Sequence, residues 1–72
     1  MLTFEPGPDG FRATTAGGVM VARVITAVLT GYDRLGAAVY APLPRAECSV
    51  HSGVGPLPVA ALEAILARLP PA

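Results

Sequence analysis

The sequence predicts a small α+β fold, an antiparallel sheet of about four strands with one C-terminal helix packed on it. Runs of β-favouring residues alternate with Gly- and Pro-rich turns along most of the chain. The one secure helical stripe lies near the C-terminus. A length of 72 residues makes one domain, residues 1–72, whose core must be thin because a chain of this size buries only about 60% of its unfolded surface.

The first element is a predicted β-hairpin. Residues 1–4 and 11–15 suit short strands, and the segment between them, Glu5-Pro6-Gly7-Pro8-Asp9-Gly10, is dense in turn residues and ends in Asp-Gly. Ala16-Gly17-Gly18 then breaks the chain before a long apolar segment.

That segment, Val19–Thr30, is ambiguous. Periodicity favours a helix with an apolar stripe, but most of its apolar residues are β-branched, which suits a pleated strand better than a helix. We favour a strand covered on both faces, which need not alternate cleanly. The alternative is that Val19–Thr30 is a first helix. The stripe residues are Val21, Val24, Ile25, Val28 and Leu29.

A second hairpin follows under the strand interpretation. Tyr32-Asp33-Arg34 forms its polar bend, and Leu35–Ala41 returns as a strand ended by the prolines at 42 and 44. Glu47–His51 is a weaker strand candidate, and residues 53–56, Gly-Val-Gly-Pro, form a loop.

The last element is a predicted helix over Pro58–Leu69. Pro58 suits a first helical turn, and Pro70-Pro71 stops the helix. One stripe is apolar and is expected to face the core: Val59, Leu62, Ile65, Leu66 and Leu69. The other face carries Ala60, Ala64 and Ala67, so a second surface can approach it closely.

Composition limits the function. The chain is 53% hydrophobic and 14% charged, against a usual charged share of about 25%, so it has more apolar side chain than so small a domain readily hides. We therefore expect a homodimer or a protein partner to cover the surplus. No apolar run is long enough to span a membrane, the start does not resemble a signal peptide, and Cys48 is the only cysteine. The expectation is a soluble, cytoplasmic protein.

The charge balance disfavours nonspecific nucleic-acid binding. Five arginines offset five acids and there is no lysine, whereas such binding depends on neutralising several phosphates. Four arginines recur every eleven residues, at 12, 23, 34 and 45, and can form a local basic strip only if they meet in space. The segments between them share no pattern, so we interpret the spacing as chance.

No catalytic or metal-binding constellation stands out. Cys48 and His51 are the only neighbouring nucleophile and base, and zinc needs about four ligands. Glu5 and Asp9 lie in a turn where solvated acids are ordinary, and Gly53-Val54-Gly55 lacks the third glycine or Lys-Ser/Thr of a phosphate loop. We expect no cofactor, no metal and no enzyme activity.

The candidate partner-binding residues are Tyr32, Asp33, Arg34 and Arg45. An aromatic next to an arginine at an exposed bend is a combination that protein interfaces enrich. The competing interpretation is an ordinary hairpin turn, in which Asp33 bonds the backbone and Tyr32 covers a core edge.

The predicted layout, several antiparallel strands and then a helix opened by a Gly-rich loop, is similar to that of the PC4-like single-stranded-DNA-binding dimers. The resemblance is one of arrangement over residues 12–69, and the basic and aromatic strand residues expected for base stacking are missing.

Three functions follow from these observations. The first is a small non-catalytic protein-binding module, an inhibitor or adaptor of the phage or mobile-element type that occupies a partner surface. The second is a dimeric single-stranded nucleic-acid binder, as the resemblance implies. The third is an enzyme that uses Cys48 or His51 at a dimer interface.

Overall fold

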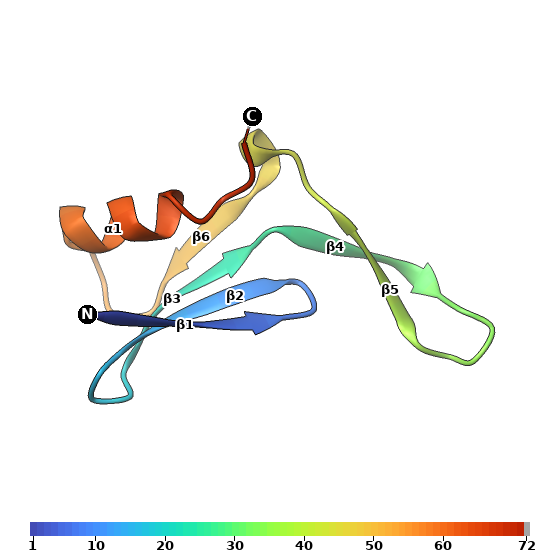
Figure 1. The fold of residues 1–72 in the computed structure, drawn as a ribbon, viewed down its shortest axis with the longest axis horizontal. Helices are drawn as coiled ribbons and strands as arrows, with labels where there is room; N and C mark the ends of the chain where they lie inside the picture. Colours follow the sequence, from blue (N-terminus) through green and yellow to red (C-terminus); the bar gives the residue numbers. More distant parts are fainter. Residues whose placement is uncertain (72) are drawn as a thin grey trace.

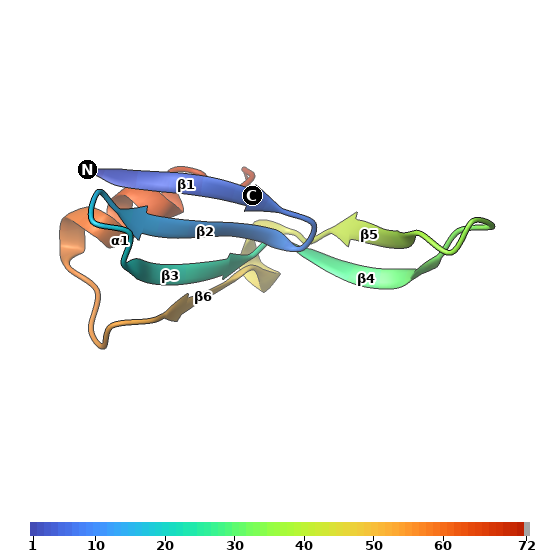
Figure 2. The same cartoon turned by 90° about the horizontal axis from the view of Figure 1, so that it is seen from below.

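The molecule consists of a sheet-and-helix body from which a separate β-hairpin projects (Figures 1 and 2). The computed structural model describes residues 1–71. A four-stranded antiparallel sheet in the order β1-β2-β3-β6 carries helix α1 on one face, while β4 and β5 form a two-stranded sheet of their own. The predicted α+β fold is confirmed. The elements are β1 (Leu2–Gly7), β2 (Gly10–Thr15), β3 (Met20–Ile25), β4 (Ala27–Tyr32), β5 (Ala38–Pro42), the 3₁₀ helix η1 (Arg45–Glu47), β6 (Ser49–Ser52) and α1 (Val59–Leu66).

The first hairpin forms as predicted, with longer strands and a shorter turn. β1 and β2 pair from Leu2 and Thr15 up to Gly7 and Gly10, which leaves Pro8-Asp9 as a two-residue turn. Pro6 lies within β1, where its missing N–H is tolerated because β1 is an edge strand.

The long apolar segment is extended, so the strand interpretation is confirmed and the helix alternative over Val19–Thr30 is wrong. It is not one strand, however. β3 ends at Ile25, Thr26 intervenes, and β4 belongs to the other sheet. The reason lies in the register of β2 against β3: Ile25 faces Gly10, the first residue of β2. Beyond Ile25 no β2 residue remains to pair with, and the chain leaves the body.

The fourth strand of the main sheet is β6, the weaker candidate, rather than the second strand of the second hairpin. β6 pairs with the free edge of β3, from Ala22 opposite Ser52 to Ile25 opposite Ser49. The second hairpin forms as β4 and β5, and it pairs with no strand of the body. Local sequence predicts both hairpins but not which strands share a sheet.

The core lies between α1 and one face of the main sheet. Cross-strand partners Ala13 and Ala22 are fully buried there, and their small side chains leave room for Ile65 of α1, which is also fully buried. Val21 and Val24 complete the buried set, with a ring of half-buried apolar residues around it: Leu2, Phe4, Phe11, Val50, Leu57 and Leu69.

The helix stripe is only partly buried, which corrects the expected core. Val59 is 73% exposed and Leu62 37% exposed, while Ile65 is buried. α1 ends at Leu66, three residues before the predicted end. Arg68 therefore lies beyond the helix rather than in its last turn, and its guanidinium lies 4.1 Å from the ring centroid of Phe4. Leu69 packs against the core from beyond the helix, so the predicted stripe is divided between buried, half-buried and exposed positions.

Candidate functional site

The β4–β5 hairpin, named the arm below and comprising residues 27–42, is held to the body only at its base. The backbone N–H groups of Thr26 and Ala27 both donate to the carbonyl oxygen of Asp9, at 2.9 and 3.1 Å. Leu43 N–H donates to the carbonyl of Thr26 at 2.8 Å. The turn between β1 and β2 thus anchors the base of the arm, and the rest extends away from the sheet (Figure 2).

Both faces of the arm are apolar. Residues opposite each other on paired strands share a face, so the register assigns each residue to one side. A bulge between Leu29 and Gly31 keeps Tyr32 on the same side as Leu29. The Leu29 face consists of Ala27, Leu29, Tyr32, Ala38, Tyr40 and Pro42, and the Val28 face consists of Val28, Gly31, Val39 and Ala41.

Several apolar residues of the arm are exposed to solvent, whereas Ala27, Tyr40 and Ala41 are half-buried. Leu29 is 48%, Val28 42% and Val39 43% exposed, and residues 27–32 and 38–42 include no charged side chain. A strand that is apolar on both sides is normally buried on both sides. In the single chain nothing within residues 1–71 covers the arm to that extent, so the arm carries part of the surplus apolar surface that the composition predicts.

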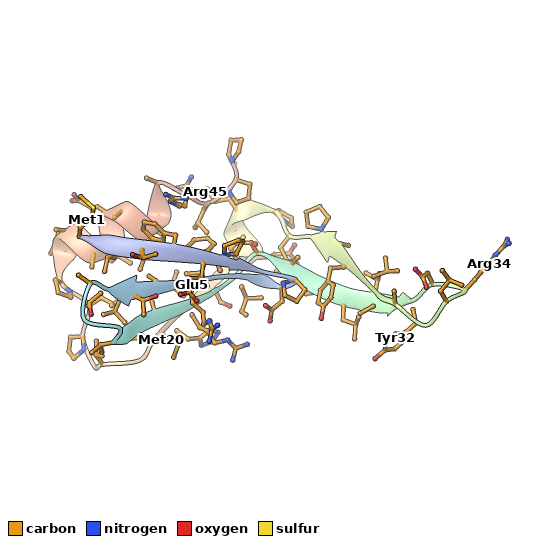
Figure 3. All side chains as sticks on the ribbon, turned by 60° about the horizontal axis from the view of Figure 1, so that its bottom comes forward. Met1, Glu5, Met20, Tyr32, Arg34 and Arg45 are labelled. Carbon is orange, nitrogen blue, oxygen red and sulfur yellow. The ribbon has the colours of Figure 1, made fainter. Side chains whose placement is uncertain are left out.

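The tip of the arm is the bend predicted from Tyr32-Asp33-Arg34. The Asp33 carboxylate accepts hydrogen bonds from the backbone N–H groups of Leu35 and Ala37, at 2.8 and 3.0 Å. Asp33 therefore shapes the turn, as the competing interpretation expected. Tyr32 is 70% exposed and covers no core edge, and Leu35 is 94% exposed. Figure 3 shows Tyr32 and Arg34 projecting at the end of the molecule farthest from the body.

Arg45 does not join this group. It lies in η1, beside the C-terminal end of α1, where its guanidinium donates to the carbonyl of Leu66 at 3.5 Å. Figure 3 places Arg45 and Arg34 at opposite parts of the molecule. The four candidate residues thus separate into a tip cluster, Tyr32, Asp33 and Arg34, and a distant Arg45.

Four polar residues of the body form a row across the face of the sheet opposite α1. Glu5, Arg12, Arg23 and His51 are cross-strand neighbours on β1, β2, β3 and β6 in that order. Arg12 lies 3.5 Å from Glu5, and Arg23 lies 3.5 Å from Asp9. Two of the regularly spaced arginines therefore meet, each beside an acid, and no continuous basic strip forms with the other two.

Cys48 and His51 make separate contacts. The Cys48 thiol lies 3.5 Å from the carbonyl oxygen of Pro44, whereas the His51 Nε2 atom lies 3.1 Å from the hydroxyl of Ser49. Within residues 1–71 no group of three or more His, Cys, Asp or Glu side chains is placed to hold a metal ion. In the same range, no helix is long and apolar enough to cross a membrane.

A second apolar surface is a groove of about 490 Å³ between the start of β1 and α1. Ala60 and Ala64, from the alanine face of the helix, line it together with Ala61. The other walls come from Met1, Leu2, Phe4 and Pro58.

Sequence reasoning singled out the tip of the arm and missed its shaft. Val28 and Leu29 lie in the segment predicted to be a strand covered on both faces, because apolar β-branched runs are usually core. Val39 lies in the strand predicted to return from the bend, for which no burial is predicted. The available signal was the stretch of nine uncharged residues from Val24 to Tyr32, which predicts burial without specifying whether this chain or another provides the cover.

No protein-family model matches the chain, and comparison with curated proteins and with solved structures found no similar protein. The arm is therefore interpreted from its own geometry.

Proposed function

We propose that this protein is a small non-catalytic protein-binding module whose arm contacts the partner. It acts as an inhibitor or adaptor of the phage or mobile-element type, by occupying a partner surface in the cytoplasm. The observation that carries the proposal is a projecting two-stranded sheet that is uncharged and apolar on both faces, with its side chains exposed.

The energetics of the arm support a bound state. An isolated two-stranded hairpin is marginally stable in water, and three or more strands or a packed face are needed for independent stability. Burial of apolar surface contributes about 25 cal/mol per Å², so covering Leu29, Val28 and Val39 stabilises both the arm and the complex. Exposed apolar patches of this kind mark interaction sites. The same surplus supports a homodimer.

The tip supplies candidate anchors. Tyrosine and arginine are enriched among the residues that dominate binding energy, and Tyr32 is exposed. Arg12, Arg23, Arg45 and Arg68 each contact an acid, a carbonyl or an aromatic ring. Within the described residues no such contact engages Arg34, so its guanidinium is available to a partner.

The test compares two arginine variants. A partner captured from the source cell is titrated with wild type, Arg34→Ala and Arg12→Ala, after thermal melts establish that all three fold. Arg34→Ala should change stability by less than about 0.5 kcal/mol and weaken partner binding by about 1 kcal/mol or more. Arg12→Ala, on the body, should leave binding within error. Equal affinities for all three would move the contact away from the tip.

The alternative, a dimeric single-stranded nucleic-acid binder, has weaker support. Arg12 and Arg23 face each other across β2 and β3, but Glu5 and Asp9 lie beside them, and the aromatic residues of the arm stand apart from this row. Nucleic-acid binding of this kind weakens steeply with salt. Retention on single-stranded DNA at low salt, lost as the salt is raised, would favour the alternative.

A further inference from the structure

We infer that a second copy of this chain pairs with the open edge of β4, so that two arms form a four-stranded antiparallel sheet in the order β5-β4-β4-β5 around a two-fold axis. This inference rests on the proposed role of the arm as the binding surface, and it names the first occupant of that surface. The two faces of the joined sheet remain for a foreign partner.

The outer edge of β4 has backbone groups ready to pair. Leu43 N–H bonds the carbonyl of Thr26, and Asp33 N–H bonds the carbonyl of Ala37, so these two pairs at the ends of the arm are hydrogen-bonded. Antiparallel ladders alternate hydrogen-bonded with non-hydrogen-bonded pairs. Counting inward from each end, Leu29 opposite Tyr40 and Tyr32 opposite Ala38 are non-hydrogen-bonded pairs. The N–H and C=O groups of Leu29 and Tyr32 therefore point away from β5.

These two residues make the edge self-complementary. When two β4 strands run antiparallel about a two-fold axis, Leu29 meets Tyr32 of the partner subunit, and Tyr32 meets Leu29 of the partner subunit. The bulge makes residues 30 and 31 count as one position of the ladder, so both pairs can exchange backbone hydrogen bonds. Both pairs lie on the Leu29 face, so an aliphatic side chain packs against an aromatic ring twice. β4 contains no charged residue, so the symmetric pairing opposes no like charges.

The other three sheet edges are less suited to pairing. β5 ends in Pro42, which has no N–H to donate, β1 carries Glu5 and Pro6, and β6 has only four residues. Proline, charge and short length are the features that protect natural edge strands. β4 has neither proline nor charge over its six residues, and its bulge between Leu29 and Gly31 leaves the backbone groups of Leu29 and Tyr32 directed outward, so this edge is open to a strand from another chain.

The free edge of β4 is long enough for the proposed pairing and ends where the other arm would end. At the base of the arm the N–H of Ala27 is already taken by the carbonyl of Asp9, which ends the edge there. In the paired arrangement this base receives the tip of the other arm. Arg34 is thereby brought toward the turn that carries Asp9 of the partner subunit, an acid of opposite charge.

Two lysine variants test the pairing of the β4 edges, and the measurement is the mass of the protein in solution. Light scattering and sedimentation at micromolar concentration should give wild type twice the 7.3 kDa mass of the chain. Leu29→Lys places a charge in the centre of the pairing and should yield a monomer. Leu35→Lys adds the same charge at the exposed tip, outside the pairing, and should remain a dimer. A wild-type monomer, or a Leu29→Lys dimer as tight as wild type, would overturn the inference.

A cross-link between the two copies tests the register directly. In a Cys48→Ser background, Leu29→Cys protein is mixed with Tyr32→Cys protein and oxidised. Hydrogen-bonded antiparallel partners lie about 5.5 Å apart at Cα, within disulfide range. The mixture should give a disulfide heterodimer. Each variant alone should not, because identical positions are offset along the strands by the span from Leu29 to Tyr32, which matches two residues of β5, or about 7 Å. Added to the spacing between strands, this offset puts their Cα atoms beyond disulfide range.

These experiments distinguish failure of the β4 pairing from failure of the proposed partner-binding function. A dimer that cross-links no better in the mixture than in either variant alone uses another surface, and overturns the β4 pairing. Partner binding that still depends on Arg34 would in that case leave the proposed function intact.

Discussion

Gly10 lies where the first hairpin, β3 and the base of the arm come together. It begins β2, pairs with Gly7 and with Ile25, and follows Asp9, whose carbonyl anchors the arm. A Cβ on Gly10 would collide with the carbonyl oxygen of Val24. β2 and β3 can approach this closely only because the position has no side chain.

Gly10→Ala should therefore lower the free energy of unfolding by about 1–3 kcal/mol, because a backbone must shift to admit the methyl group. Gly17→Ala is the matched control, since its Cβ would meet only the Thr15 hydroxyl at an ordinary 3.8 Å. Urea denaturation of both variants measures the difference. Equal midpoints would show that the β2–β3 approach is not tight.

Cys48 and His51 are expected to be replaceable. Cys48→Ser keeps a donor for the Pro44 carbonyl, and His51→Ala removes an exposed ring whose contact is a hydroxyl. Each substitution should change stability by less than about 1 kcal/mol and leave partner binding unaltered. Thermal melts and elemental analysis check this, and stoichiometric metal in the purified protein would contradict it.

At the scale of elements, α1 contributes one fully buried side chain, Ile65, which packs on the alanines of β2 and β3. Leu62 lies one turn earlier and is 37% exposed, so the two positions differ in burial on the same helix.

Ile65→Ala should cost about 2–5 kcal/mol, comparable with the whole stability of a domain of this size. Leu62→Ala should cost distinctly less, because much of that side chain already faces water. Both substitutions introduce alanine, the best helix former, so neither loses stability through helix propensity. Far-ultraviolet circular dichroism during urea titration measures both; a larger loss for Leu62→Ala would place the core elsewhere.

For the whole molecule, a dimer joined through the arms links stability to concentration. If unfolding separates the two copies, each tenfold rise in protein concentration stabilises the dimer by about 1.4 kcal/mol. The melting temperature of wild type should rise across a hundredfold concentration range, and that of Leu29→Lys should stay constant. If the melting temperatures of the two proteins depend on concentration in the same way, the arms do not couple folding to association.

Local sequence determined the elements of this protein. The Pro- and Gly-rich segment before Gly10 specifies the first hairpin, the β-branched residues after Val19 favour strand over helix, and the bend at Asp33 closes the second hairpin. The C-terminal apolar stripe specifies α1, though not its end. Each of these depends on neighbours along the chain, which is why pattern reasoning could find them.

Tertiary structure decided where the apolar segments go. Whether β4 lies in the main sheet depends on the length of β2, and whether Ile65 or Leu62 is the buried residue of α1 depends on how the helix packs on the sheet. The same limit applies to the candidate site: the tip was predicted from residue types, but the exposed shaft and open edge of the arm follow from strand pairing. The hydrophobicity of a sequence indicates how much apolar surface must be covered. Only the packing of distant segments determines which apolar surface stays exposed.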